Sequence, residues 1–197
     1  HVIICFEHIS ELAAIRLEDE PLWDGQAKSS RYQNFGPSGC YVPDTIRGSE
    51  TEANYRGILS SLFACYSQLH DPLKKFIAGK NPRPADMKEA DYDRTIAARA
   101  FDVTRYLLPL AVRTNVGQVV SIRTLEKQIT RMLSSQLPEL QGIGEDLKES
   151  CQRPPMNIWG ELSGQTGPAD PLAPTLARHA KANPYQAEVY ADLAKHA

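Results

Sequence analysis

The chain has 197 residues, of which 42% are hydrophobic, so it can bury one substantial core and a single domain is the expected arrangement. Its formal net charge of -2 lacks the basic excess that holds a nucleic-acid backbone, so phosphate recognition has to be local. No run approaches the roughly 20 apolar residues that span a bilayer, and the first residues lack the pattern of a signal peptide. The 4 cysteines are far apart, with no C-x-x-C spacing. We therefore expect a cytoplasmic protein with no metal, no nucleic-acid partner and no membrane contact.

The first third of the chain changes from strand to loop to helix. β-branched and aromatic residues predict a strand over residues 1–9, whereas Pro and Gly interrupt the pattern over 18–35 and predict a loop. A short extended stretch precedes a helix predicted over 51–77, in which Pro72 is expected to introduce a kink. The helix carries an apolar stripe that we expect in the core, and this stripe consists of Ile58, Leu59, Leu62, Cys65, Tyr66 and Leu69.

Three further helices are predicted in the second half. They cover residues 91–107, residues 121–133, and a segment that starts within 134–139 with Pro138 at an early position. Residues from 153 to about 174 are rich in Pro and Gly, and short amphipathic helices follow. The pattern predicts a domain over residues 1–152 and a C-terminal extension over 153–197. The fold class is α+β, with helices packed on a small mixed β-sheet.

The segment Ser29-Ser30-Arg31-Tyr32 places two hydroxyls beside a guanidinium in a predicted loop. This combination can give a phosphate several donors at once, because Arg binds phosphate bidentately. From spacing alone, a solvated loop is the more common meaning of such a segment.

Several arginines lie in predicted helices that are otherwise apolar. Arg105 lies so close to the expected buried face that its guanidinium needs a partner. For a single arginine, an internal ion pair with Asp102 or a snorkelling side chain is the more common arrangement, whereas several together favour anion binding. The set comprises Arg99, Arg105, Arg123 and Arg131.

Other candidate sites are weaker. The acidic run Glu18-Asp19-Glu20 has no histidine beside it and is more typical of a solvated face than of a metal site. Glu7 and His8 are neighbours on a strand, so they are expected to point to opposite faces and not to act together. No nucleophile elbow supports a Ser–His–Asp hydrolase.

Taken together, these segments resemble the flavin-dependent thymidylate synthases over most of the chain up to about Cys151. Each segment alone is a weak match, but their order and approximate spacing make the set more specific. The S-x-R-Y loop corresponds to Ser29-Ser30-Arg31-Tyr32, and the H-x-x-x-x-E-H-like strand to His1 and Phe6-Glu7-His8 with one extra residue. The A-R-x-V-L-P helix end, the N-x-R-S-L helix and the L-R-x-x-x-x-A-Q stretch are similar to residues 103–109, 121–125 and 131–141.

The resemblance implies a methyltransferase that places a methyl group on C5 of a uridine monophosphate, converting dUMP to dTMP or UMP to 5-methyl-UMP. FAD, NADPH and 5,10-methylenetetrahydrofolate would serve as cofactors, in active sites between the subunits of a homotetramer. The implied nucleotide-binding residues are Ser29, Ser30, Arg31, Arg105 and Arg131, with Ser29 and Arg131 catalytic, as donors that stabilise charge on the uracil ring. The implied flavin contacts are His1, Glu7, Gln26, Ser121 and Arg123.

The chain departs from the family pattern just upstream of S-x-R-Y. Where the family has an R-H-R flavin clamp, this chain reads Asp19-Glu20-Pro21, so acidic residues replace the cations. The distance from Glu7 to Arg31 is also shorter than in the family, so a strand is missing or the chain omits residues. Two alternatives therefore stay open: a uridine-nucleotide-binding homologue without methylase activity, and a helical interaction domain whose arginines form salt bridges.

Overall fold

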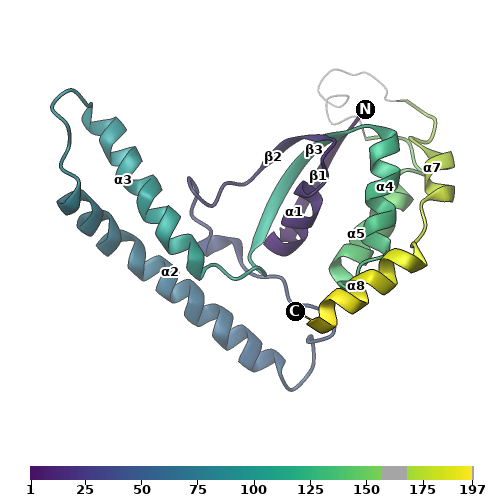
Figure 1. The fold of residues 1–197 in the computed structure, drawn as a ribbon, viewed down its shortest axis with the longest axis horizontal. Coiled ribbons are helices and arrows are strands. Elements are labelled where there is room, and N and C mark those ends of the chain that lie inside the picture. Colours follow the sequence, from purple (N-terminus) through teal and green to yellow (C-terminus); the bar gives the residue numbers. More distant parts are fainter. Residues whose placement is uncertain (157–167, 197) are drawn as a thin grey trace. The chain divides into compact units, whose positions relative to one another are not determined.

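The computed structural model describes residues 1–156 and 168–196 (Figure 1). A three-stranded antiparallel sheet of order β1-β3-β2 accompanies a larger helical part, so the predicted α+β class is confirmed, and the sheet expected to be mixed is antiparallel. The strands are β1 (Val2–Ser10), β2 (Trp23–Ala27) and β3 (Arg113–Val120). The helices are α1 (Glu11–Glu18), α2 (Glu52–Lys80), α3 (Glu89–Thr104), α4 (Ile122–Leu133), α5 (Pro138–Ser150), α7 (Pro174–His179) and α8 (Pro184–His196), with 3-10 turns η1 (Gly36–Ser38) and η2 (Arg105–Leu107).

The strand predicted at the start of the chain is confirmed as β1, but the rest of the sheet was not foreseen. The predicted loop over 18–35 is wrong for Trp23–Ala27, which form β2. The backbone N–H of Lys28 donates to the carbonyl of Asn115 at 3.1 Å, so β2 pairs with β3. Neither β3 nor α1 was predicted, and α1 starts where the Ser10 hydroxyl accepts a hydrogen bond from the backbone N–H of Ala13 at 3.0 Å.

The chain divides into two compact units. The first unit contains His1–Ile4, Arg16–Gly25 and Gln118–Ala197, and the second contains Cys5–Ile15 and Gln26–Gly117. The division into a domain over residues 1–152 and an extension over 153–197 stays a prediction. Within residues 1–156 and 168–196, no helix combines the length and the apolar character that crossing a membrane requires.

In the second unit, α2 packs against α3, and only part of its apolar stripe is buried. Tyr66 is 1% exposed, and its hydroxyl accepts a hydrogen bond from the backbone N–H of Phe35 at 3.4 Å. Leu59 is also buried, whereas Ile58 is 63% exposed and Leu69 40%. The expectation that the whole stripe belongs to the core is therefore wrong for this chain taken alone, because α3 covers one side of α2 only.

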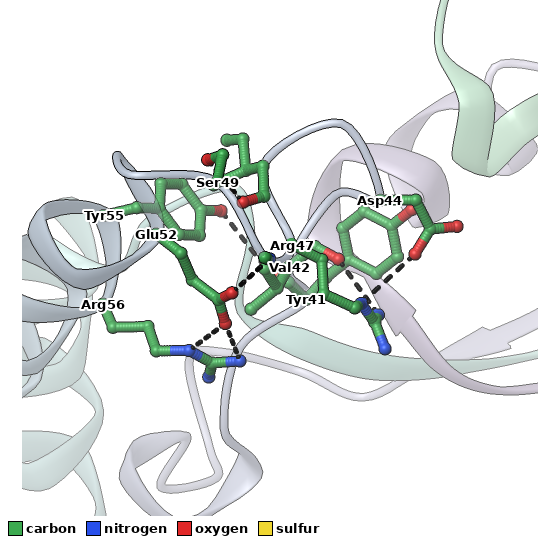
Figure 2. A network of polar contacts seen from close by, with 10 residues as sticks. Tyr41, Val42, Asp44, Arg47, Ser49, Glu52, Tyr55 and Arg56 are labelled. Atoms are coloured by element: carbon green, nitrogen blue, oxygen red, sulfur yellow. Dashed lines mark hydrogen bonds and ion pairs between the residues drawn. The ribbon is translucent and has the colours of Figure 1, made fainter.

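A polar network fastens the start of α2 to the preceding loop (Figure 2). The Glu52 carboxylate accepts hydrogen bonds from the Gly48 backbone N–H at 2.6 Å and from Arg56 Nε at 2.7 Å. The hydrogen bond from Gly48 and then the one from Arg56 lower the pKa of Glu52. The Tyr55 hydroxyl donates to the carbonyl of Tyr41 at 3.1 Å. Because Gly48 has φ +76°, a conformation that side-chain-bearing residues rarely adopt, glycine suits this turn.

In the first unit, α4, α5 and α7 pack together. The predicted helix over 121–133 is confirmed as α4, and the Ser121 hydroxyl caps it by accepting the backbone N–H of Thr124 at 3.1 Å. In α5, Gly144 allows the close approach to α4, because a Cβ there would lie 3.1 Å from Leu133 Cδ2 and 3.2 Å from Met132 Cβ. The short helices expected after about residue 174 are α7 and α8. Within the Pro- and Gly-rich stretch from 153 to about 174, residues 157–167 lie outside the described part of the chain.

Candidate functional site

Two of the predicted nucleotide-binding residues, Arg31 and Arg105, meet on one carboxylate in the second unit. Arg31 Nε lies 3.2 Å from Asp102 Oδ2, and Arg105 Nη2 lies 3.7 Å from Asp102 Oδ1. Arg31 comes from the loop after β2, Asp102 from the last turn of α3, and Arg105 from the C-cap of that helix. We call Arg31 and Arg105 the arginine pair. In the part of the chain that the structure describes, Asp102 is the only carboxylate within ion-pair distance of the two guanidinium groups, so the cluster keeps one positive charge in excess.

The arginine pair remains open to solvent. The side chain of Arg31 is 50% exposed and that of Arg105 is 41% exposed. Arg31 is anchored through Nε, and among the described residues its two terminal Nη groups have no hydrogen-bonding partner. A guanidinium held in this way keeps its outer edge free for bidentate binding of a phosphate or carboxylate.

The loop that carries Arg31 is shaped by Ser29. The Ser29 hydroxyl accepts a hydrogen bond from the backbone N–H of Arg31 at 3.3 Å, and its carbonyl accepts one from Gln33 N–H at 3.1 Å. The Arg31 guanidinium lies over the Tyr32 ring, 5.7 Å from its centroid. Ser30 is half-buried, and its hydroxyl has no partner among the residues that the structure describes. Ser29 thus sets the turn, while Ser30 and Arg31 keep donors available.

Arg131 lies in the first unit and is enclosed. Its Nη2 is 3.6 Å from Glu20 Oε2, its Nη1 donates to the Asp19 carbonyl at 3.2 Å, and its Nη2 donates to the Arg16 carbonyl at 3.4 Å. These contacts close the C-terminal end of α1, where backbone carbonyls lack helical partners. Glu20 is 8% exposed, so the expectation of a solvated acidic face is wrong for this residue. No cluster of His, Cys, Asp and Glu suited to a metal ion occurs within the described part of the chain.

Two of the predicted flavin contacts, Glu7 and Gln26, line one hollow in the second unit with a volume of about 440 Å³, which we call the first hollow. Asn115 lines it too, and its Oδ1 accepts the backbone N–H of His8 at 2.8 Å, so its amide NH₂ can still donate to a ligand. His8 has φ 58°, and this left-handed conformation breaks the alternation of β1. Glu7 and His8 are both exposed, and their placement on opposite faces of the strand stays a prediction. Lys28 and Gln33 also line the first hollow.

His1 and Ser121 line a second hollow, of about 630 Å³, in the first unit. The Ser121 hydroxyl is already occupied by its contacts with Thr124, at 3.1 Å from its backbone N and 2.8 Å from its Oγ1. Arg123 is exposed on α4 and does not line either hollow. The first hollow, with one ammonium and 3 carboxamide side chains, has the donor set that fits a ligand with phosphate and carbonyl groups.

Sequence reasoning missed Lys28, Gln33 and Asn115 as residues of the first hollow. The position of Lys28 directly before Ser29 could have indicated it. No feature of the sequence indicated Asn115, because the strand β3 to which it belongs was not predicted.

The chain belongs to the family described as thymidylate synthase complementing protein, whose model matches residues 3–153. The resemblance drawn from the motifs is thereby confirmed. The chain is 28% identical over 148 residues to a UPF0159 protein of Chlamydia muridarum (strain MoPn / Nigg), and 27% identical over 149 residues to a UPF0159 protein of Chlamydia pneumoniae. These matches cover 72% and 73% of this chain but 28% of each relative, so the chain spans little more than a quarter of their length.

Solved structures of similar fold include the UMP/dUMP methylase PolB from Streptomyces cacaoi bound with 5-Br dUMP. The two share a TM-score of 0.50 and 14% identity, over 90% of this chain and 69% of that one. A structure of ThyX from Helicobacter pylori with FAD and dUMP aligns with a TM-score of 0.39 and 18% identity, over 75% of this chain and 65% of that one. At these identities the likeness to PolB concerns the fold.

Proposed function

We propose that the chain forms the nucleotide-binding part of a flavin-dependent methylase that places a methyl group on C5 of dUMP or UMP. Family membership over residues 3–153 supports the class of reaction. The main observation in favour of a nucleotide site is that Arg31 and Arg105, from separate segments, both contact the Asp102 carboxylate. Two solvent-accessible guanidinium groups fixed by one carboxylate suit a phosphate monoester.

In this proposal the phosphate is bound by the arginine pair and the hydroxyls of Ser29 and Ser30. Arg131 and Ser29 are the proposed catalytic residues, as donors that stabilise charge developing on the uracil ring. Since the Arg131 guanidinium is engaged with Glu20 at 3.6 Å, it has to exchange this carboxylate for the nucleotide. Nucleotide binding should therefore loosen the contact between α4 and the end of α1.

The first hollow is the proposed place of the cofactor, because Glu7, Gln26 and Asn115 present polar groups to it. When bound, a reduced flavin supplies the hydride that turns the methylene group of 5,10-methylenetetrahydrofolate into a methyl group, and NADPH restores the reduced flavin. The chain's own residues hold and orient the ligands. His1, Ser121 and Arg123 remain proposed flavin contacts.

We also propose that the chain works in the cytoplasm as a homotetramer with active sites between subunits. The support is the uncovered apolar surface of α2, where Ile58 is 63% exposed and Phe76 62% exposed. Light scattering of the purified chain checks the assembly, and a monomer at all concentrations would contradict it.

A second function, a uridine-nucleotide-binding homologue without methylase activity, is favoured by the acidic segment Asp19-Glu20-Pro21. This segment stands where the family carries its flavin clamp, and its Glu20 side chain is buried against Arg131. A chain of this kind binds the nucleotide but leaves the flavin free.

One assay separates the two functions. The protein is incubated with 5,10-methylenetetrahydrofolate, FAD, NADPH and either dUMP or UMP, and the product is measured by mass spectrometry. We expect a methylated nucleotide from at least one of them. Nucleotide binding without a methylated product would support the non-catalytic homologue. The absence of both binding and product would contradict both proposed functions.

A further inference from the structure

Lys28 carries a half-buried positive charge that has no counter-ion among the described residues. Its Nζ lies 2.6 Å from the Ser38 hydroxyl oxygen and 4.3 Å from the centroid of the Phe35 ring. Within residues 1–156 and 168–196, no carboxylate lies within ion-pair distance of this ammonium. An ammonium has three N–H donors, so one is used and two stay available. Phe35 is fully buried, and the Lys28 ammonium lies over its ring.

Lys28 is also the only cationic residue among those that line the first hollow. The lining otherwise offers the carboxamides of Gln26, Gln33 and Asn115, and one carboxylate, Glu7. Lys28 follows the last residue of β2, and its backbone N–H bonds to Asn115 O at 3.1 Å, so the strand pairing fixes where its side chain starts. A single cation beside three carboxamides and one carboxylate can bind one phosphate group of a larger ligand.

We call Asp19-Glu20-Pro21, which stands where the family has its R-H-R flavin clamp, the clamp segment. Its composition makes a cation elsewhere necessary for phosphate binding. Asp19-Glu20-Pro21 brings carboxylates where the family pattern has cations, so this segment cannot attract a phosphate. The positive charge next along the chain is Lys28, directly before Ser29.

We propose that Lys28 receives a phosphate group of the ligand bound in the first hollow and supplies the positive charge that the clamp segment lacks. The inference rests on the proposed function, because it takes the ligand to be the flavin cofactor or the uridine nucleotide. Both ligands carry phosphate. Lys28, which lines the first hollow, directly precedes Ser29-Ser30-Arg31-Tyr32 in the sequence. The test below separates the two sources.

The test compares Lys28→Met with wild type in equilibrium titrations of FAD, riboflavin, dUMP, UMP and uridine, followed by flavin fluorescence and calorimetry. Methionine keeps an apolar stem over Phe35 and removes the charge. The matched control is Lys127→Met, a change at an exposed lysine of α4. Thermal unfolding verifies that each variant folds, and Lys28→Gln replaces Lys28→Met if the latter does not.

We expect Lys28→Met to weaken FAD binding about tenfold, as loss of one charge-assisted hydrogen bond does, and to leave riboflavin, which has no phosphate, unchanged. Lys28→Arg should retain most of the affinity. If dUMP or UMP is weakened tenfold while FAD is not, the phosphate that Lys28 receives is that of the nucleotide. Equal affinities of wild type and Lys28→Met for every phosphate-bearing ligand would overturn the proposal and leave the proposed function intact. A wild-type chain that binds neither FAD nor a uridine nucleotide would overturn both.

Discussion

The arginine pair and Arg131 carry the same functional group in opposite surroundings. Arg31 and Arg105 have side chains that are 50% and 41% exposed and share one carboxylate. Arg131 is 22% exposed, and its guanidinium contacts the Glu20 carboxylate and two backbone carbonyls. The first arrangement leaves donors for a ligand, whereas the second uses them to close the end of α1. An arginine predicted from a motif can therefore serve binding, stability or both, and its surroundings decide which.

The largest effect should come from Arg131→Ala. Removal of this guanidinium leaves the Glu20 carboxylate buried without its partner and two carbonyls unpaired, so we expect about 2–4 kcal/mol lower free energy of unfolding. Urea denaturation measures the change. Arg123→Ala, on the exposed side of the same helix, is the control and should stay within about 0.5 kcal/mol of wild type. Equal free energies of unfolding for Arg131→Ala and Arg123→Ala would mean that Arg131 does not stabilise the C-terminal end of α1.

The arginine pair should show the opposite behaviour. We expect Arg31→Ala and Arg105→Ala each to weaken binding of dUMP or UMP by about 1.5–3 kcal/mol, through loss of a charge-assisted contact. Stability should change by less than about 1 kcal/mol, because exposed ion pairs contribute little. Calorimetric titration measures the affinity.

The control for the arginine pair is Arg94→Ala, at a side chain of α3 that is 84% exposed. Its affinity for the nucleotide should equal that of wild type. Unchanged affinity in both Arg31→Ala and Arg105→Ala would reject the assignment of the phosphate site.

A smaller effect concerns the packing of α5 on α4, the helix that presents Arg131. Gly144→Ala brings a Cβ to 3.1 Å from Leu133, whereas Gly142→Ala meets no atom within 4 Å. Alanine at residue 142 should stabilise the helix, and the two variants should differ by about 1–2 kcal/mol in free energy of unfolding. Equal stabilities, measured by thermal unfolding, would mean that the helices do not approach as closely as described.

The smallest effect is a pH dependence in the second unit, at His70. Its ring stacks on Phe101 with centroids 4.0 Å apart, and burial, then the charge of Lys74, lowers the pKa of His70 below its usual 6.5. The folded chain favours the neutral imidazole of His70. The contribution of this neutral ring to the free energy of unfolding is therefore complete above about pH 6.5 and is lost as pH falls through the lowered pKa. His70→Phe keeps the stack and should reduce the loss of stability between pH 7 and 5. An unchanged pH profile would contradict this role.

The sequence predicted those elements whose local pattern is strong. The long apolar periodicity of α2, the helix over 121–133 that became α4 and the β-branched run of β1 were predicted from the sequence. The strand β3 was not predicted from the sequence, because its buried face includes the polar Thr114 and Gln118. The alternation of hydrophobic and polar residues is therefore weak there. The strand β2 has five residues, and only its two ends are partly buried.

The candidate site was predictable as a set of residue types but not as an arrangement. The ion pair of Arg105 with Asp102, three residues earlier, was anticipated from the sequence and is present. Nothing in the sequence indicates that Arg31 also reaches Asp102, because that contact depends on how the loop after β2 meets α3. Likewise, the burial of Glu20 against Arg131 follows from the packing of α4 on the end of α1. Side chains such as Lys28, whose importance lies in a missing counter-ion, become recognisable only once the neighbours are known.

A calorimetric titration of the wild-type chain with dUMP, UMP and uridine tests the phosphate site directly. We expect at least one of the two nucleotides to bind, and uridine, which lacks the phosphate, to bind at least about tenfold more weakly. Affinity that is equal with and without the phosphate, or no binding of either nucleotide, would show that the arginine pair is not a phosphate site.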